Sequence, residues 1–130
     1  MNVMIIGASA GLGRALAEEM AAKGHRLLLV SRDERDLDAI AKDLKARFEI
    51  EVDYIAADLT ALDVDRFRDQ VLSLLSPLDA VFIVAGLADD EDVGPLPTQR
   101  ARNLLDANLV VPALIANAFF DHLAEREKAH

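Results

Sequence analysis

Short apolar runs alternate with stretches of helical periodicity along this chain of 130 residues. Strands are predicted at residues 3–6, 26–31, 51–56 and 80–84, helices at 12–23, 34–48 and 61–75, and one long helix near the carboxyl end. Strands of almost continuous Val, Ile and Leu are buried on both faces, which is typical of parallel sheets with right-handed crossovers. The pattern predicts one doubly wound α/β domain, residues 1–130, with a parallel sheet in strand order 3-2-1-4.

The heptapeptide GASAGLG, residues 7–13, lies between the first predicted strand and the first predicted helix. Gly7 permits a tight exit from the strand, Gly11 lets the backbone approach a pyrophosphate, and Gly13 lets the helix lie close to the sheet. The free N–H groups and the dipole at the start of the helix favour an anion. The heptapeptide therefore predicts a phosphate site. A turn that merely connects strand and helix is the alternative.

The spacing G-x-x-x-G-x-G, followed by Arg14-Ala15-Leu16-Ala17, resembles the short-chain dehydrogenase/reductase family, whose NAD(P)-dependent enzymes interconvert alcohols and carbonyls. The common G-x-G-x-x-G spacing would require glycine at position 16. The resemblance covers essentially the whole chain, as the cofactor-binding half of the family, and implies a Rossmann-like domain. It also implies a set of residues around the dinucleotide: Gly7, Ser9, Ala10, Gly11, Leu12, Gly13, Ser31, Arg32, Asp58, Leu59, Ala85 and Gly86.

The second predicted strand ends in Ser31-Arg32, where dinucleotide-binding domains usually place an acidic residue for the adenosine ribose. A carboxylate there would repel a 2′-phosphate, whereas a hydroxyl and a guanidinium can both donate to one. NADP(H) is therefore favoured over NAD(H). Arg32 as a solvated charge beside Asp33 and Glu34 is the alternative. Ala10 also lacks the second positive charge that many NADP-preferring relatives carry at its place.

Two further positions follow the third and fourth predicted strands. Asp58-Leu59 resembles the family's Asp-hydrophobic pair, whose carboxylate accepts from the adenine amino group. A local turn bond, with Thr60 capping the next helix, is the competing role. Ala85-Gly86 resembles the end of the family's Asn-Ala-Gly, with Val84 in place of the asparagine. The backbone can still pass under the cofactor, but one amide side chain is missing.

A proline is predicted to bend the long last helix. Pro112 lies four residues after Asn108, so it cannot donate to the Asn108 carbonyl, and its ring crowds that oxygen. Asn108 resembles the family's asparagine whose main-chain oxygen binds a water of the proton relay, so it is the one candidate catalytic residue. A tolerated kink with an outward asparagine is the alternative.

The family's other catalytic groups, a serine on the next strand and a Tyr-x-x-x-Lys motif beyond it, have no counterpart in the 130 residues. The single tyrosine, Tyr54, falls in the third strand, and Asp58 stands where the motif has lysine. The resemblance therefore implies the NADP(H)-binding portion of an oxidoreductase, and we predict that this chain alone does not transfer hydride.

Composition excludes several other classes. The net charge of −9 argues against nucleic acid and anionic membrane surfaces as partners. The chain has no cysteine for disulfides or thiol chemistry. No stretch is predicted to be long and apolar enough to span a bilayer, and the first strand begins at once, so a cytoplasmic location is expected.

No metal site is predicted. His25, His122 and His130 are not spaced as a set of ligands. The acidic loop 87–98 is predicted to be a solvated surface. Counted from Asp89, the loop has Gly94 at the position of the sharp turn in a calcium-binding loop. However, Val93 then occupies a ligand position, and Arg100 occupies the position of the last ligand, a glutamate.

The last helix carries more apolar side chains than one sheet face covers: Leu109, Val110, Leu114, Ile115, Phe119 and Phe120. In the family this helix builds a dimer interface, and strand 80–84 would be an open edge. We therefore expect a homo-oligomer formed through the helix, the strand or both. Two other functions stay open: a non-enzymatic nucleotide sensor or interaction subunit, and a different doubly wound enzyme for another phosphate ligand.

Overall fold

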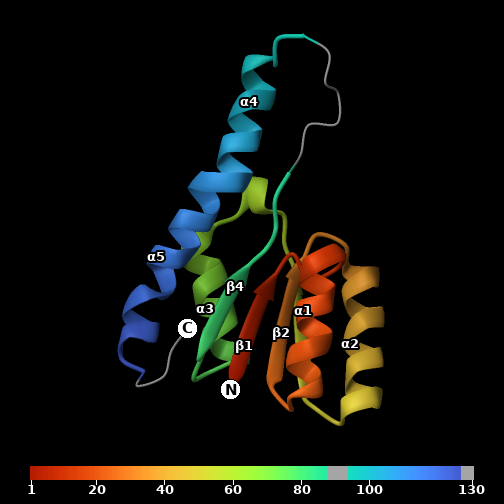
Figure 1. Cartoon of the computed structure of the whole chain (residues 1–130). Helices are drawn as coiled ribbons and strands as arrows, with labels where there is room; N and C mark the ends of the chain where they lie inside the picture. The colour runs from red at the N-terminus through yellow and green to blue at the C-terminus, as the bar shows by residue number, and fades with distance from the viewer. Residues whose placement is uncertain (88–93, 127–130) are drawn as a thin grey trace.

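A computed structural model describes residues 1–87 and 94–126 and shows the predicted parallel sheet (Figure 1). The strands are β1 (Asn2–Ile6), β2 (Arg26–Ser31), β3 (Val52–Ala56) and β4 (Ala80–Ile83). They lie in the order β3-β2-β1-β4, and each neighbouring pair is parallel. The predicted fold class and strand order are confirmed.

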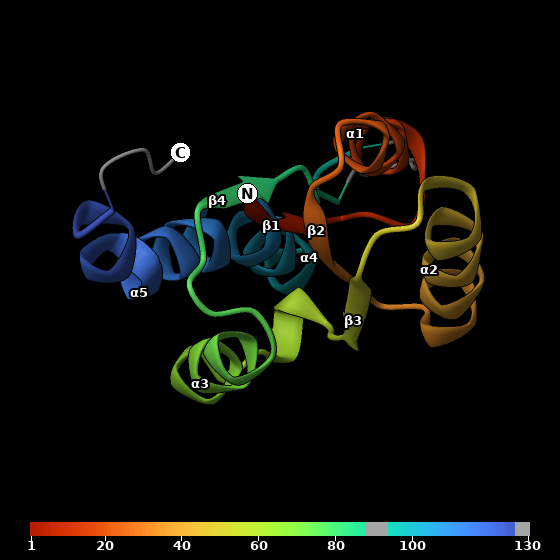
Figure 2. The same ribbon diagram turned by 90° about the horizontal axis from the view of Figure 1, so that it is seen from below.

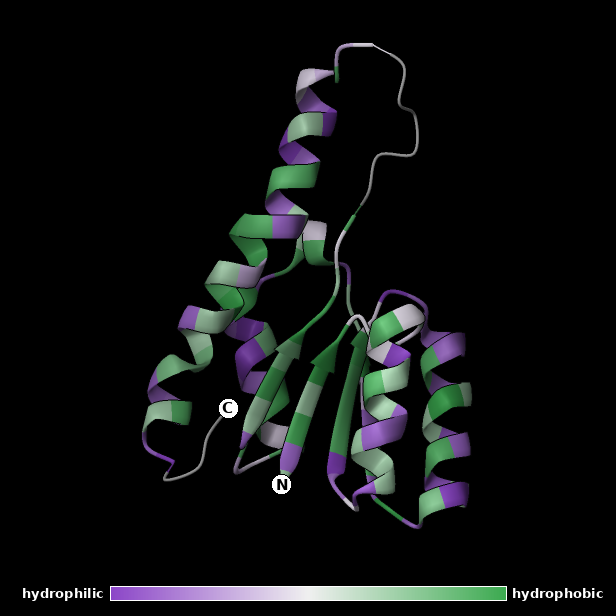
Figure 3. Ribbon diagram, viewed as in Figure 1, coloured by the Kyte–Doolittle hydropathy of each residue, from purple (hydrophilic) through white to green (hydrophobic). Residues whose placement is uncertain are grey.

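Helices cover both faces of the sheet (Figure 2). One face carries α1 (Gly11–Ala22) and α2 (Glu34–Phe48), and the other carries α3 (Val64–Leu74) and α5 (Val111–Ala124). Because side chains alternate along a strand, Val3 and Ile5 of β1 pack toward α1 and α2, whereas Met4 and Ile6 pack toward α3 and α5. The strands are therefore apolar on both faces, which is why their sequences are continuous apolar runs (Figure 3).

The predicted helix at 61–75 is wrong at its start. A short 3₁₀ turn, η1 (Leu59–Ala61), comes first, and α3 begins only at Val64. Asp63 caps α3 by accepting from the main-chain N–H of Arg66 at 3.0 Å, so Thr60 does not cap it. Two aspartates five positions apart each open a helical turn, which divides the predicted helix into two.

The long last helix is interrupted as predicted, but by a π-turn. α4 (Thr98–Leu105) continues through η2 (Asp106–Val110) into α5, and the N–H of Val111 reaches five residues back to the Asp106 carbonyl. Ile115 and Phe119 are buried in the core. The predicted excess of apolar surface is confirmed, since Leu109, Val110, Leu114 and Phe120 of the same helical run stay exposed.

The expectation that no stretch could span a bilayer was wrong. By length and composition alone, the helical run Thr98–Ala124 qualifies, with a mean hydropathy of 1.4 over its most apolar window. Only 22% of that window is buried. In this fold the second part of the run, α5, covers the sheet through Ile115 and Phe119, whereas α4 has no buried residue.

The end of α5 is fastened to the start of β4. The guanidinium of Arg126 donates to Asp79 at 2.7 Å, and the Leu78 N–H donates to His122 Nε2 at 3.1 Å. Asp79 also accepts from the Asn2 N–H at 2.8 Å, which joins the start of β1 to the same carboxylate. One largely buried carboxylate therefore holds three elements together.

Acid is expected to weaken this fastening. The Asn2 N–H, and then the Arg126 guanidinium, hold the pKa of Asp79 below its ordinary value of 3.8. Because the folded-state pKa is the lower one, the stabilisation is complete above the unfolded-state pKa and is lost as pH falls through the folded one. Thermal unfolding between about pH 5 and 2 should depend less steeply on pH in Asp79→Asn than in the parent chain. Asp65→Asn, at a carboxylate 85% exposed, is the matched control. Equal slopes in the parent and Asp79→Asn would contradict the prediction.

Candidate functional site

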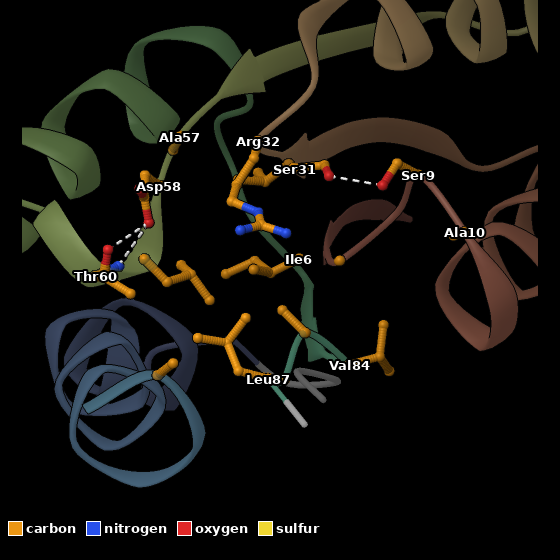
Figure 4. A pocket seen from close by; sticks show the side chains of 16 residues that line it. Ile6, Ser9, Ala10, Ser31, Arg32, Ala57, Asp58, Thr60, Val84 and Leu87 are labelled. Carbon is orange, nitrogen blue, oxygen red and sulfur yellow. Dashed lines mark hydrogen bonds between the residues drawn. The ribbon is translucent and has the colours of Figure 1, made fainter. Parts of the chain in front are cut away.

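A pocket of about 300 Å³ opens at the carboxyl ends of β1, β2, β3 and β4 (Figure 4). This is where open α/β sheets bind ligands, at the point where the strand order reverses. The pocket has predicted and unpredicted lining residues. The predicted ones are Gly7, Ser9, Ala10, Ser31, Arg32, Asp58, Leu59, Ala85 and Gly86. The others are Ile6, Val30, Ala57, Thr60, Val84, Leu87 and Ala107.

Two glycines of the heptapeptide are required by close contacts. Gly7 has a φ of +91°, and a Cβ there would lie 2.6 Å from the Ala85 nitrogen. A Cβ on Gly13 would collide with the Gly7 carbonyl and lie 2.9 Å from Cγ2 of Val84. Gly13 thus lets α1 start directly against the end of β1, as predicted. Gly11 has a φ of +51° and open space around it, which leaves room for a ligand.

The start of α1 faces this space with free donors. Ala10 precedes the helix and has no side chain that can cap it, and the first turn has no acidic residue. Its first N–H groups are therefore available to an anion. Leu12, which is 73% exposed, and its neighbours Gly11 and Gly13 lie beside the pocket lining rather than in it. The glycine turn and the start of α1 fit a pyrophosphate, because free backbone N–H groups point to it and Gly11 lets the ligand come close to the backbone.

Polar groups gather at one end of the pocket. The hydroxyl oxygens of Ser9 and Ser31 lie 2.7 Å apart, so the glycine turn and the end of β2 are joined there. The guanidinium of Arg32 extends into the pocket between this serine pair and Asp58 (Figure 4). The same Arg32 also borders an outer hollow with Asp33 and Asp36. Arg32 is thus placed at the pocket, and two carboxylates lie close behind it.

Asp58 forms the local turn that the sequence analysis gave as the alternative to binding adenine. Its Oδ1 accepts from the Thr60 N–H at 2.9 Å and from the Thr60 hydroxyl at 2.8 Å. These two bonds, together with the nearby Arg32, hold the pKa of Asp58 below 3.8, although partial burial opposes them. Both bonds engage Oδ1, so Oδ2 is available to a ligand as far as the described part of the chain is concerned. The turn role is present, and the adenine role remains a prediction.

Asn108 holds the chain after β4 through its side chain. Its Oδ1 accepts from the Leu87 N–H, and its Nδ2 donates to the Leu87 carbonyl, both at 2.8 Å. A Cβ on Gly86 would lie 2.7 Å from that Oδ1, so glycine is needed beside it. Asn108 therefore positions the segment that lines the pocket. Its predicted relay role through the main-chain oxygen remains a prediction.

Replacing Asn108 by alanine is expected to loosen this segment. The variant removes two neutral bonds, each of which contributes about 1 kcal/mol, so the Leu87 amide should exchange with solvent about five- to thirtyfold faster in Asn108→Ala. Hydrogen exchange followed by NMR measures this directly. Asn103→Ala is the matched control, because the Asn103 side chain bonds only to Gln99 among the described contacts. Unchanged exchange at Leu87 would show that the clamp does not hold the segment.

Tyr54 is not placed as a catalytic tyrosine. Its hydroxyl lies 3.4 Å from Asp38, whose other oxygen accepts from Lys42 at 2.6 Å, and none of the three lines the pocket. Partial burial, and then the Asp38 and Glu34 carboxylates, raise the pKa of Tyr54. A general acid–base needs a pKa closer to the working pH. This cluster stabilises the packing of α2 on β3.

No group of three potential metal ligands occurs among the described residues. His25 lies 3.2 Å from the amino-terminal nitrogen, and His122 accepts from the main chain, so each is used structurally. The calcium-binding loop considered in the sequence analysis includes Asp89 and Val93, which lie outside the described residues. Gly94 and Arg100 are described, and Arg100 lies in α4.

Comparisons with known proteins decide the family. The model of the short chain dehydrogenases matches residues 1–130. The chain belongs to the short-chain dehydrogenase family. Members of this family bind a nicotinamide dinucleotide, which agrees with the position of the pocket and the cradle.

Individual relatives are longer than this chain. An uncharacterized oxidoreductase of Myxococcus xanthus is 30% identical over 99% of this chain and 51% of its own length. The inactive hydroxysteroid dehydrogenase-like protein 1 of Homo sapiens is 40% identical over 96% of this chain and 38% of its own length. The alcohol dehydrogenase of Thermococcus sibiricus, solved with 5-hydroxy-NADP, has a TM-score of 0.84 and 31% identity over 94% of this chain and 52% of its own. The chain thus spans about half the length of such relatives, or less.

The sequence analysis did not predict two sets of residues that line the pocket: three apolar residues at the ends of strands, and Ala107 of the last helical run. Ile6 ends β1, Val30 is the last residue but one of β2, and Ala57 directly follows β3, so their position at the carboxyl edge was a usable signal. Ala107 lies one position before Asn108 in the π-turn, and no local pattern marks it. Its presence depends on how the last helix crosses the end of the sheet.

Proposed function

We propose that this chain binds NADP(H) in the pocket at the carboxyl ends of the strands, in preference to NAD(H). One observation carries the preference: the Arg32 guanidinium enters the pocket beside the Ser9–Ser31 pair, and the residue that ends β2 is a serine rather than an acid. A cation with two hydroxyls near it favours a 2′-phosphate. A relative solved with an NADP derivative supports this choice.

We propose further that the 130 residues alone do not transfer hydride. The dinucleotide would supply the hydride acceptor or donor, whereas this chain supplies the cradle, the Arg32 charge and the segment held by Asn108. Its one tyrosine lies outside the pocket, and none of the described residues pairs a tyrosine with lysine there. In the complete protein, we infer interconversion of alcohol and carbonyl substrates, as in the family.

Self-association is part of the same proposal. Leu105, Leu109, Leu114 and Phe120 are exposed along one helical run, and each is between 49% and 66% accessible. Covering such side chains gives about 25 cal/mol for each Å² of apolar area, so a homodimer through this run is favoured. Because Ala107 of the same run lines the pocket, a ligand-controlled assembly is the second candidate function.

The deciding experiment is a calorimetric titration of the purified chain with NADPH. Separate titrations with NADH and with ATP give the affinities for comparison. Saturable binding of NADPH, weaker for NADH and ATP, supports the proposal. Tighter binding of ATP would favour a different phosphate ligand. Light scattering with and without NADPH follows the assembly, and a change of mass on binding would support the sensor function.

A further inference from the structure

An outer hollow lies beside the Arg32 end of the pocket. It measures about 420 Å³ and is lined by Ser9, Ser31, Arg32, Asp33 and Asp36. The two serines and Arg32 also line the pocket itself, so a phosphate bound to them would border both spaces. The other two lining residues are acids, which repel a phosphate. The hollow thus combines donors that favour a phosphate with carboxylates that oppose one.

The two carboxylates of the hollow are used differently. Oδ1 of Asp33 caps α2, because it accepts from the main-chain N–H groups of Arg35 and Asp36 at 2.9 and 3.2 Å. The charge of Asp33 is therefore partly compensated at the start of the helix, and its loss would cost stability. The side chain of Asp36 has no hydrogen bond or ion pair within the described part of the chain. Its charge can act on a ligand in the hollow.

Arg32 does not neutralise these acids. Among the residues that the structure describes, no carboxylate oxygen lies within 4.0 Å of its guanidinium nitrogens. Instead, the guanidinium extends into the pocket (Figure 4). A phosphate beside Arg32 therefore meets the attraction of one cation and the repulsion of the Asp36 carboxylate. Because Arg32 and Asp36 are both exposed, water and salt weaken this repulsion without removing it.

We propose that Asp36 is a specificity-determining residue, which limits the preference of this chain for NADP(H) over NAD(H). Its carboxylate repels the 2′-phosphate across the outer hollow. NAD(H) has a hydroxyl group in place of that phosphate, and Asp36 does not line the pocket for the rest of the dinucleotide. The inference rests on the proposed function, since it requires the 2′-phosphate to lie beside Arg32.

The test is a calorimetric titration of the parent chain and of Asp36→Asn, each with NADPH and with NADH. Asparagine removes the charge at nearly constant size, and the main-chain N–H of position 36 can still bond to Asp33. A phosphate monoester carries about 1.5–2 negative charges at pH 7. Removing one exposed charge near it is expected to tighten NADPH binding about three- to tenfold. The affinity for NADH should change by less than about twofold.

Glu34→Gln is the matched control. Glu34 and Asp36 are both exposed acids in the first turn of α2, so each substitution removes the same charge from the same end of the helix. Glu34 lines neither the pocket nor the hollow, so the ratio of the two affinities should stay within about twofold of that of the parent. Added salt should reduce the gain in Asp36→Asn, whereas a gain that came from altered packing would persist.

The results separate this inference from the proposed function. The inference alone is overturned if the parent prefers NADPH but Asp36→Asn leaves the ratio of affinities unchanged. It is also overturned if Glu34→Gln raises the ratio equally, or if salt does not reduce the gain. A parent without preference contradicts the proposed function, and a preference that then arises only in Asp36→Asn supports the inference. If neither cofactor binds the parent or the variant, both are overturned.

Discussion

Replacing Phe119 by alanine should lower the free energy of unfolding by about 3–5 kcal/mol, the usual cost of removing a fully buried aromatic ring. Phe119 is 0% exposed and lies among the core side chains between the sheet, α3 and α5. Its ring meets Phe67 of α3 edge-on, with centroids 6.4 Å apart at 87°. The substitution removes both the buried area and this aromatic contact.

The next residue in the chain provides the control. Phe120 has the same side chain on the same helix but is 66% exposed, so Phe120→Ala should change stability by less than about 0.5 kcal/mol. Urea unfolding followed by circular dichroism compares the two variants with the parent chain. Equal losses would mean that α5 does not pack on the sheet as described. A large loss for Phe120→Ala alone would show that its exposed face is covered in solution.

The fold was largely predictable because each strand is apolar on both faces. Continuous apolar runs such as residues 27–30 between helical stretches are typical of strands in the middle of a covered parallel sheet, and the crossover rule then leaves few strand orders. The strand and helix bounds agree with the predictions to within one or two residues, apart from the start of α3. There, Asp58 and Asp63 both act as caps, and the local pattern could not show that the chain makes two separate turns.

The site was predictable where a residue type is required by the backbone. Gly7 and Gly13 are fixed by contacts with Ala85 and Val84 that no larger residue allows. The Asn108 clamp on Leu87 could not be predicted, because its partners lie 21 positions apart and meet only when α4 and η2 cross the sheet end. The same reason explains Ala107. Sequence patterns report local geometry well, whereas such contacts depend on tertiary packing.

Arg32→Ala is the substitution expected to affect ligand binding most. Hydrogen bonds to a charged group contribute about 1.5–3 kcal/mol, so NADPH should bind roughly 10- to 150-fold more weakly. The exposed position of Arg32 and the nearby Asp36 place the expected loss toward the lower end of this range. NADH has no 2′-phosphate, so its affinity should change by less than about twofold. Calorimetric titration of the parent chain and of Arg32→Ala, each with NADPH and with NADH, gives the four dissociation constants needed.

Arg35→Ala is the matched control, since Arg35 lies three positions later in α2 and does not line the pocket. It removes the same charge from the same region, so any general effect of net charge should appear in both variants. The NADPH affinity of the parent should also fall more steeply with salt than that of Arg32→Ala, because one ion pair fewer is screened. Equal weakening of NADPH and NADH in Arg32→Ala would show that Arg32 shapes the pocket through Asp58 and its turn. The proposed preference for NADP(H) would then lose the residue that carries it, because the donors at the start of α1 face a pyrophosphate that both cofactors have.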